Sequence, residues 1–327
     1  MIKNDRLNGI TYLRVSVTDR CNLRCKYCMP EEGVADKPHQ KILSYEELEK
    51  IISVSAELGV THIRLTGGEP LVRKDLDYFI KKIDEIEQIK DISITTNGVL
   101  LSKLGEKLKK AGLDRVNISL DTLDPDKFKF ITRRENFSDV IAGIDTALAL
   151  DLKPVKVNTV LMKDFNLDEV EEFIKFVKER DINLRFIEFM PVSGDSDHSK
   201  HFYPVEKVKK ELVDKYRLHK VSMRGVGPSE DYTADGFKGS IGFIAALTHK
   251  FCGSCNRLRL TADGKLRVCL VSDKELILKK DGKLLEKDKL KEAFFKAVSC
   301  KPKGHDFLGA NLDINNIKER KMFQIGG

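Results

Sequence analysis

Three closely spaced cysteines, Cys21, Cys25 and Cys28, stand near the start of the chain in DRCNLRCKYCMP. Three thiolates this close together can wrap one soft metal centre, because sulfur suits zinc, copper(I) and iron–sulfur clusters. A structural zinc site closes with four protein ligands, and a catalytic zinc site with three usually includes histidine. The nearest histidine here is His39. Three cysteines on a four-iron cluster would leave one iron open, so the spacing favours a reactive cluster over a structural metal site.

A second group of three cysteines, Cys252, Cys255 and Cys269, lies in FCGSCNRLRLTADGKLRVCL. Asp263-Gly264 is a strong hairpin signal, so the chain should fold back there and return Cys269 to the neighbourhood of Cys255. A zinc ribbon would need a further cysteine close to Cys269. The only spare is Cys300, which we expect to be a buried thiol. A second iron–sulfur cluster with an open iron fits this group better than zinc.

The composition is that of a globular protein with metal or redox chemistry. The chain has 327 residues, about two domains' worth, with 41% hydrophobic and 33% charged residues. Seven cysteines, an odd number, argue against a disulfide framework. The net charge of +7 favours acidic ligands such as phosphates but is too small to indicate nucleic acid. No apolar run approaches a membrane span and the start lacks a signal-peptide pattern, so we expect a cytoplasmic protein without membrane association.

Short β-rich runs alternate with amphipathic helices through the first ~190 residues and predict six βα units. The expected strands are Leu13–Val17, His62–Leu65, Asp91–Thr95, Arg115–Leu120, Val155–Leu161 and Leu184–Phe189. Ser44-x-x-Glu47 predicts a capping box, with Gly59 ending that helix, and Asn166-x-x-Glu169 is expected to open another helix. Consecutive βα units imply right-handed crossovers and a parallel sheet, either open or an incomplete barrel. Ligands of such folds gather at the carboxyl ends of the strands.

The βα pattern stops after Phe189. We expect a domain boundary near residues 190–220, giving domains at 1–200 and 201–327. In the second part, Val205–Tyr216 and Leu290–Val298 predict helices, and Gly242–Leu247, Leu258–Thr261 and Lys265–Leu270 predict strands. Arg257 and Arg259 precede the hairpin turn, and its register decides whether they share a face with Cys269. The sequence leaves that register open.

Cys-x3-Cys-x2-Cys with Tyr27 before its last cysteine resembles the signature of the radical S-adenosylmethionine superfamily. In that family the open iron chelates the amino and carboxylate groups of S-adenosylmethionine, and one-electron reduction yields methionine and a 5′-deoxyadenosyl radical. The family fold is a partial (β/α)6 barrel, which agrees with the six units. The resemblance implies that Gly68 of the Thr66–Pro70 turn holds the methionine amino group, and that Tyr27, Ser119 and Met190 line the same cofactor.

Nearly the whole chain resembles the GTP 3′,8-cyclase family of molybdenum cofactor biosynthesis. The matching segments are RVSVTDRCNLRCKYCMP, IRLTGGEPLVRKDL, TTNG, VNISLDTLD, KVNTV, RFIEFMP, FCGSCNRLRLTADGKLRVCL and the terminal IGG. The resemblance implies that the open iron of the second cluster binds guanine. It also implies GTP contacts from Arg14, Arg64, Thr95, Lys156, Arg257 and Arg259. Several cations are physically sensible, because a buried triphosphate needs paired positive charge. Catalytic roles are implied for Arg257, Arg259 and a tail ending in Gly326 and Gly327 that enters the active site.

The resemblance therefore implies an α/β fold: an incomplete (β/α)6 TIM-like barrel, followed by a smaller C-terminal α+β domain carrying the second cluster. Two [4Fe-4S] clusters and S-adenosyl-L-methionine are the expected cofactors. The expected reaction cyclises GTP to (8S)-3′,8-cyclo-7,8-dihydroguanosine 5′-triphosphate. An electron donor and a downstream cyclic pyranopterin monophosphate synthase are the expected partners, and the oligomeric state, a homodimer included, stays open. The alternatives are a peptide-modifying radical enzyme, which would usually carry more C-terminal cysteines, and a non-enzymatic zinc or regulatory iron–sulfur module.

Overall fold

The computed structural model describes residues 7–34, 41–192, 198–223, 227–302, 304 and 320–326. Six parallel strands run side by side in chain order, each end within one residue of its predicted position. They are β1 (Tyr12–Ser16), β2 (His62–Thr66), β3 (Asp91–Thr96), β4 (Arg115–Ser119), β5 (Lys156–Leu161) and β6 (Asn183–Glu188). The six βα units predicted from the sequence are thus confirmed.

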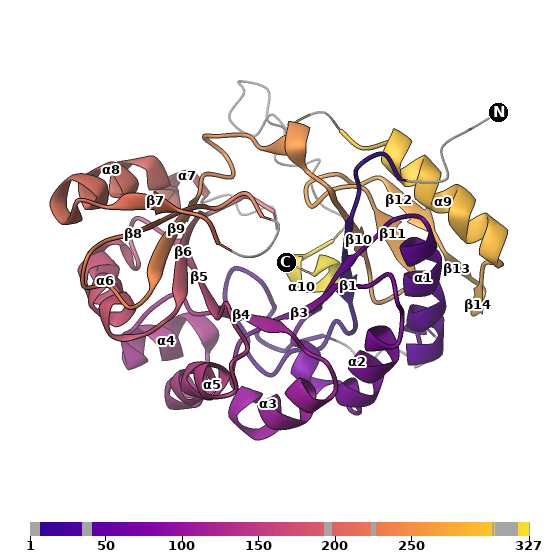
Figure 1. Ribbon diagram of the computed structural model, residues 1–327, viewed down its shortest axis with the longest axis horizontal. Coiled ribbons are helices and arrows are strands. Elements are labelled where there is room, and N and C mark those ends of the chain that lie inside the picture. Colours follow the sequence, from indigo (N-terminus) through magenta and orange to yellow (C-terminus); the bar gives the residue numbers. More distant parts are fainter. Residues whose placement is uncertain are drawn as a thin grey trace.

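The C-terminal half extends this sheet at both edges. β10 (Arg257–Leu260) pairs parallel with β1, and β9 (Ser240–Ile244) pairs parallel with β6. The outer strands are antiparallel: β11 (Lys265–Arg267) and β12 (Glu275–Ile277) follow β10, and β8 (Glu230–Thr233) and β7 (His219–Val221) follow β9. Among the described strands, β12 and β7 are the two ends of one twelve-stranded sheet. The sheet is therefore an incomplete barrel, and Figure 1 shows it as a broad open arc.

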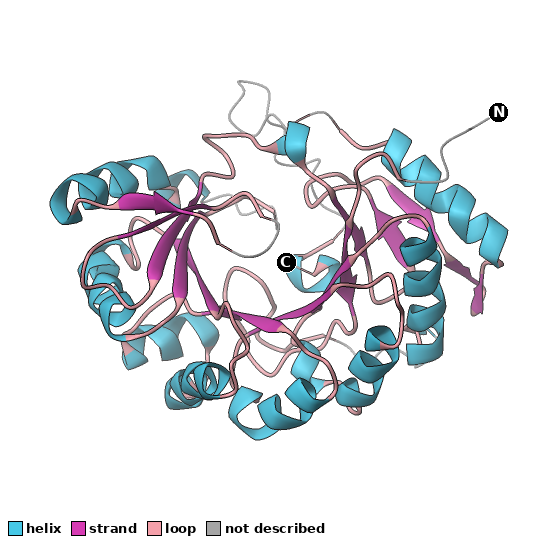
Figure 2. Cartoon of the chain, in the orientation of Figure 1, coloured by secondary structure: helices cyan, strands magenta, loops and turns pink. Residues whose placement is uncertain are grey.

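Helices cover the convex face of the arc, while the C-terminal end of the chain lies on the concave side (Figure 2). The helices of the first half are α1 (Tyr45–Glu57), α2 (Leu76–Asp84), α3 (Leu101–Lys110), α4 (Pro125–Thr132), α5 (Phe137–Ala149) and α6 (Val170–Glu179), with short 3-10 turns at η2 (Pro70–Val72) and η3 (Leu167–Glu169). Each of these α-helices buries apolar side chains, such as Leu48, Ile51 and Ile52 of α1. The described helices include none long and apolar enough to cross a membrane.

The starts of two helices show where local sequence signals predict a capping hydrogen bond correctly and where they do not. The capping box at α1 is present, because Ser44 Oγ accepts from Glu47 N (3.2 Å) and Glu47 Oε2 accepts from Ser44 N (2.8 Å). The helix expected to open at Asn166 is present as η3 followed directly by α6, but the Asn166 side chain makes no capping hydrogen bond, because its amide donates to the carbonyls of Asp121 (2.6 Å) and Val160 (2.9 Å). Here tertiary hydrogen bonds that fix the end of β5 take precedence over a local cap.

The second half contains the predicted helix α8 (Val205–Tyr216), α9 (Lys287–Ser299), the short α7 (His198–His201) and α10 (Met322–Ile325), η4 (Cys252–Ser254), and a small ribbon of β13 (Lys279–Lys280) and β14 (Lys283–Leu284). One buried apolar cluster contains residues from both halves, including Leu13, Ile63, Ile241 and Leu258. The division at residue 200 stays a prediction, while the sheet and core run through it.

Candidate active site

Both cysteine groups line one cavity on the concave side of the sheet, with a volume of about 400 Å³. Cys21, Cys25 and Cys28 follow β1, whereas Cys252, Cys255 and Cys269 flank the β10–β11 hairpin. β10 lies directly beside β1, which brings the groups together although more than two hundred residues separate them. Cys300 is half-buried at the C-terminal end of α9 and is not among the lining residues.

The first cysteine loop is held by main-chain hydrogen bonds to a neighbouring helix. Arg24 N and Lys26 N both donate at 2.9 Å, to the carbonyls of Thr132 and Ile131 at the end of α4. Burial raises the pKa of the Cys21 thiol to about 11 and that of Cys28 to about 12, and neighbouring thiols and carboxylates add to the effect. Buried thiolates therefore need a bound cation.

The donor set fits iron–sulfur clusters. Each group offers three soft sulfurs at the wall of a cavity, which is the chemistry that such clusters use. Within the described ranges, no three His, Cys, Asp or Glu side chains surround a single metal-ion position.

The Gly67-Gly68 turn lies directly against the backbone that leads into Cys21. Gly68 N donates to Thr18 O and Glu69 N donates to Arg20 O, both at 2.8 Å. A Cβ on Gly67 would lie 2.2 Å from Thr18 O, and one on Gly68 would lie 2.3 Å from Arg20 O. Only glycine tolerates this approach, so the turn and the cysteine loop are built as one unit.

Glu69 fixes the next strand end to that unit. Its carboxylate accepts from Leu71 N (3.0 Å), the Thr96 hydroxyl (2.7 Å) and Asn97 N (2.7 Å). Burial raises its pKa to about 7 despite these hydrogen bonds. Asn97 in turn donates from its amide toward Cys21 Sγ at 3.8 Å, so the ends of β2 and β3 both orient the first cysteine group.

The four residues expected to contact S-adenosylmethionine all line this cavity: Tyr27, Gly68, Ser119 and Met190. Tyr27 donates its hydroxyl to Asp121 Oδ2 at 2.6 Å, and Val160 N donates to the other oxygen of the same carboxylate at 2.9 Å. Burial raises the pKa of both Tyr27 and Asp121. The sequence analysis did not single out Asp121, and its only signal was a buried carboxylate at a strand end.

A row of arginines crosses three adjacent strands at the same level. Arg14 of β1 is the register partner of Arg64 of β2 on one side and of Arg259 of β10 on the other. Burial, followed by repulsion from Arg259 and Arg64, lowers the pKa of Arg14 well below its usual value. All three line the cavity. Three arginine charges this close together repel one another, so the arrangement is unfavourable unless a bound anion neutralises them.

Lys156 and Thr95 complete the predicted polar wall. Lys156 is 2% exposed, and burial together with the charges of Arg185, Arg115 and Arg64 lowers its pKa to about 6, although Asp231 opposes the shift. Thr95 Oγ1 is buried without a hydrogen-bond partner among the described residues, and so is Asn158 Oδ1. Both residues line the cavity. These orphaned polar atoms are what a polar ligand would satisfy.

The sequence analysis missed two cations at this site. Arg185 of β6 lines the cavity, is 7% exposed, donates to Asn183 Oδ1 at 2.7 Å and lies 3.9 Å from Asp231 Oδ1. Lys301 also lines it and donates to the carbonyls of Arg257 (2.8 Å) and Val268 (3.2 Å), which ties the two hairpin strands together. For Arg185 the available signal was a charged residue inside a strand that otherwise reads as buried.

The hairpin register, which the sequence left open, places the arginines on the cavity side. Arg259 pairs directly with Arg267, and Arg257, Arg259 and Cys269 all line the cavity. Burial opposes ionisation of Cys255, but the charge and hydrogen bond of Arg257 outweigh it and lower the pKa of this thiol to about 7. In the second group, positive charge thus lowers the pKa of a thiol, whereas in the first group burial outweighs the charges of Arg24 and Lys321 and the pKa values of Cys21 and Cys28 are raised.

The last described residues of the chain reach the same cavity. Met322 and Phe323 are lining residues, and Arg259 donates to the carbonyls of Gly326 and, at 3.4 Å, Ile325. Gly326 adopts φ +66°, and a Cβ there would lie 2.6 Å from Thr66 Cγ2. The predicted position of Gly327 lies outside the described residues.

Comparison with known proteins assigns the family. Residues 15–177 match the Radical SAM superfamily, and residues 182–307 match the family described as Molybdenum Cofactor Synthesis C. The GTP 3′,8-cyclase of Petrotoga mobilis is 48% identical over 98% of this chain and 98% of its own length. The chain belongs to the GTP 3′,8-cyclase family. The cyclase of Thermodesulfovibrio yellowstonii is also 48% identical, over the full length of both chains.

Solved structures share the fold of this GTP 3′,8-cyclase family member. Streptococcus suis SuiB with its precursor peptide SuiA superposes with a TM-score of 0.59 at 17% identity, covering 89% of this chain and 66% of SuiB. The enzyme anSMEcpe with bound AdoMet gives 0.57 at 17% identity, covering 89% of this chain and 81% of its own. The chain spans about two thirds of the length of SuiB. At these identities the likeness concerns the fold alone, and it agrees with the α/β architecture of the chain.

Proposed function

We propose that this chain is a radical S-adenosylmethionine lyase that cyclises GTP to (8S)-3′,8-cyclo-7,8-dihydroguanosine 5′-triphosphate, the first step of molybdenum cofactor biosynthesis. The observation that carries the proposal is one cavity that is lined by both cysteine groups and by several arginine and lysine side chains. Full-length identity to curated cyclases supports it independently.

Each cysteine group would hold one [4Fe-4S] cluster, Cys21, Cys25 and Cys28 the first and Cys252, Cys255 and Cys269 the second. Tyr27, Gly68, Ser119 and Met190 would hold S-adenosylmethionine beside the first. When bound there, this pair supplies a 5′-deoxyadenosyl radical able to remove hydrogen from C3′ of GTP. We assign the first role to residues 1–200 and the second cluster and tail to 201–327.

The chain's own side chains bind and orient the nucleotide. Arg14, Arg64 and Lys156, with the neighbouring Arg185, offer a dense set of cations for a triphosphate, and each charge-assisted hydrogen bond contributes about 1.5–3 kcal/mol. Thr95 offers a polar group that has no other partner among the described residues. Arg257 and Arg259 stand at the second cysteine group, where the guanine would lie. Holding C3′ and C8 in place is what makes a unimolecular ring closure fast.

Burial of the site explains how such a reaction avoids side reactions. The lining residues include apolar groups such as Leu23, Val160, Ile187 and Phe189 that exclude water around the reacting carbons. Met322 and Phe323 of the tail line the same cavity. We propose that a one-electron donor reduces the first cluster in the cytoplasm, and that the product passes to cyclic pyranopterin monophosphate synthase.

An anaerobic assay tests the proposal. The reconstituted chain is incubated with GTP, S-adenosylmethionine and a strong reductant, and the cyclised nucleotide, an isomer of GTP with the same mass, is separated from it by chromatography and identified by NMR. About eight irons per chain are expected for two four-iron clusters. Cleavage of S-adenosylmethionine without any GTP-derived product would contradict the substrate assignment. Iron near zero with tightly bound zinc would contradict the cofactor assignment.

A further inference from the structure

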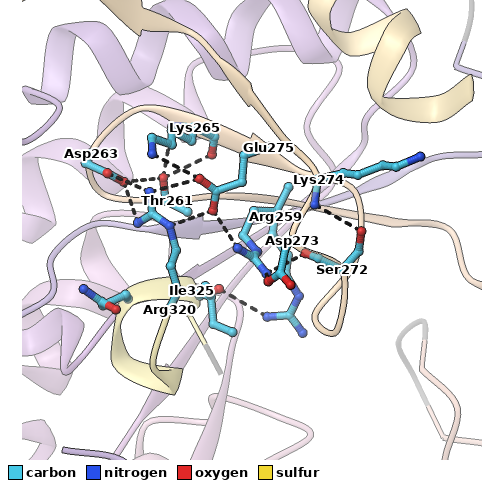
Figure 3. A network of polar contacts seen from close by, with 12 residues as sticks. Arg259, Thr261, Asp263, Lys265, Ser272, Asp273, Lys274, Glu275, Arg320 and Ile325 are labelled. Carbon is cyan, nitrogen blue, oxygen red and sulfur yellow. Dashed lines mark hydrogen bonds and ion pairs between the residues drawn. The ribbon is translucent and has the colours of Figure 1, made fainter. Parts of the chain in front are cut away.

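Arg320 attaches the start of the described C-terminal tail to the β10–β11 turn and to β12. Its Nη1 and Nη2 donate to Asp263 Oδ1 and Oδ2 at 3.0 and 2.8 Å. On the other side, Nε lies 2.6 Å from Glu275 Oε1 and Nη2 donates to Glu275 Oε2 at 3.1 Å. Figure 3 shows the guanidinium between the two carboxylates. The side chain is 10% exposed, so both pairs are largely shielded from water.

Asp263 and Glu275 together form the socket for Arg320, and neighbouring side chains hold both carboxylates in position. Asp263 stands in the β10–β11 turn, where the Thr261 hydroxyl donates to its Oδ1 at 2.6 Å. Glu275 begins β12, where Arg267 donates to it at 2.6 Å and Lys265 lies 3.3 Å away. The socket therefore belongs to the same strands that carry Arg259 and lead to Cys269. A guanidinium suits two carboxylates at once because its donors form a planar fork, which an ammonium lacks.

The tail continues from Arg320 into the cavity within a few residues. After Arg320 come Lys321 and the single turn α10, whose Phe323 and Ile325 are 4% and 2% exposed. Gly326 then lies against Thr66, and its carbonyl accepts from Arg259. The described part of the tail is thus held by Arg320 at the β10–β11 turn, and by Arg259 and a main-chain hydrogen bond of Phe323 to Cys28 in the cavity. The described tail buries only two large apolar side chains, Phe323 and Ile325, so we expect the ion pairs of Arg320 to supply a substantial part of its retention.

We propose that Arg320 is a positioning residue, a latch that holds the C-terminal tail in the cavity through Asp263 and Glu275. The importance of that tail for the reaction rests on the proposed function, but its docking does not. Removing the guanidinium forfeits several charge-assisted hydrogen bonds, so the ratio of docked to released tail should fall by roughly tenfold or more.

A tryptophan reporter measures docking directly, because the chain contains no tryptophan. Phe323→Trp places the fluorophore on α10 in the cluster-loaded, full-length chain. In this background, low accessibility to acrylamide is expected. Adding Arg320→Gln should raise the acrylamide quenching constant and shift the emission to the red. Arg320→Lys, which can satisfy one carboxylate but not both, should give an intermediate value.

Arg180→Gln is the matched control. Arg180 also lies near two carboxylates, at 3.3 Å from Asp145 and 3.8 Å from Glu179, but it is not among the cavity-lining residues. This variant should leave quenching unchanged. A double-mutant cycle then tests the contact itself: Asp263→Asn should release the tail too, and adding it to Arg320→Gln should have less than the additive effect.

The results of these quenching and double-mutant experiments either support or overturn the proposed role of Arg320. Unchanged quenching in Arg320→Gln, or strict additivity with Asp263→Asn, overturns the latch. Should Arg320→Gln fail to fold by circular dichroism, Arg320→Lys and Asp263→Asn give the same test. Since the measurement needs no GTP and no turnover, failure of the latch is distinguishable from failure of the proposed function. A released tail with full GTP cyclisation would contradict the role given to the tail and leave the latch standing.

Discussion

Binding of GTP should be coupled to proton uptake by Lys156. With its pKa lowered to about 6, Lys156 is mostly neutral at neutral pH in the unliganded protein. Burial is the main cause, and Arg185 on β6, Arg115 on β4 and Arg64 on β2 add repulsion that Asp231 on β8 only partly offsets. A bound triphosphate places negative charge close to Lys156. The complex therefore stabilises the ammonium form and raises the pKa of Lys156.

The size of the coupling follows from this shift. At pH 7 about one tenth of Lys156 is charged before binding, and at pH 8 about one hundredth, because each pH unit above the pKa costs about 1.4 kcal/mol. A triphosphate has lost its last proton well below this range, since phosphate groups have second pKa values near ~6. The affinity for GTP should therefore fall by about tenfold per pH unit between pH 7.5 and 9.

Isothermal titration calorimetry measures this coupling without turnover. Titrations of GTP at pH 7.5 in buffers of different ionisation enthalpy should report uptake of close to one proton per GTP. Lys156→Arg is the matched control, because arginine stays charged and should abolish both the uptake and the pH slope. Proton uptake that persists in Lys156→Arg, or an affinity independent of pH in the wild-type chain, would refute the reasoning.

Three further predictions concern the first cluster, the substrate pocket and the tail. Cys21→Ser should abolish S-adenosylmethionine cleavage and lower the iron content to about four per chain, and retained cleavage would show that the first cysteine group does not hold the cofactor cluster. Arg257→Ala should lose cyclisation while keeping S-adenosylmethionine cleavage, as judged by methionine release against nucleotide product; unaffected product would count against its place in the substrate pocket. Gly326→Ala should lose most product formation, because a Cβ at φ +66° would meet Thr66 at 2.6 Å, and a normal rate would mean that the tail does not work in this conformation.

Much of the fold could be predicted because its signals are local. The strands β1 to β6 are runs of apolar and β-branched residues whose ends the pattern placed within one residue. The capping box at Ser44 and the turn at Asp263-Gly264 depend on neighbouring residues alone, and both are present. Asn166 shows the limit of this reasoning, because its side chain bonds to Asp121 and Val160 across the sheet and so does not act as a cap.

The residues of the candidate site also divide into those that the sequence predicts and those that it does not. Both cysteine groups could be recognised from their spacing, and so could the side chains matched to the family's motifs. Arg185 carried only the weak signal of a charge inside a strand that otherwise reads as buried, and Lys301, which follows a helix, has no local feature that separates a cavity wall from a solvated surface. The Arg320 latch could not be recognised either, because its partners Asp263 and Glu275 lie 57 and 45 residues away along the chain.

Residue type and spacing alone determined the chemistry of this protein, because thiol donors, capping residues and strand patterns act over a few residues. The tertiary structure decided which of these groups meet. Pairing of β10 with β1 brings the second cysteine group to the first, and the register of Arg259 with Arg14 and Arg64 turns scattered charges into one row. Such contacts depend on strand order and on alignment to a single residue, which only the folded sheet specifies.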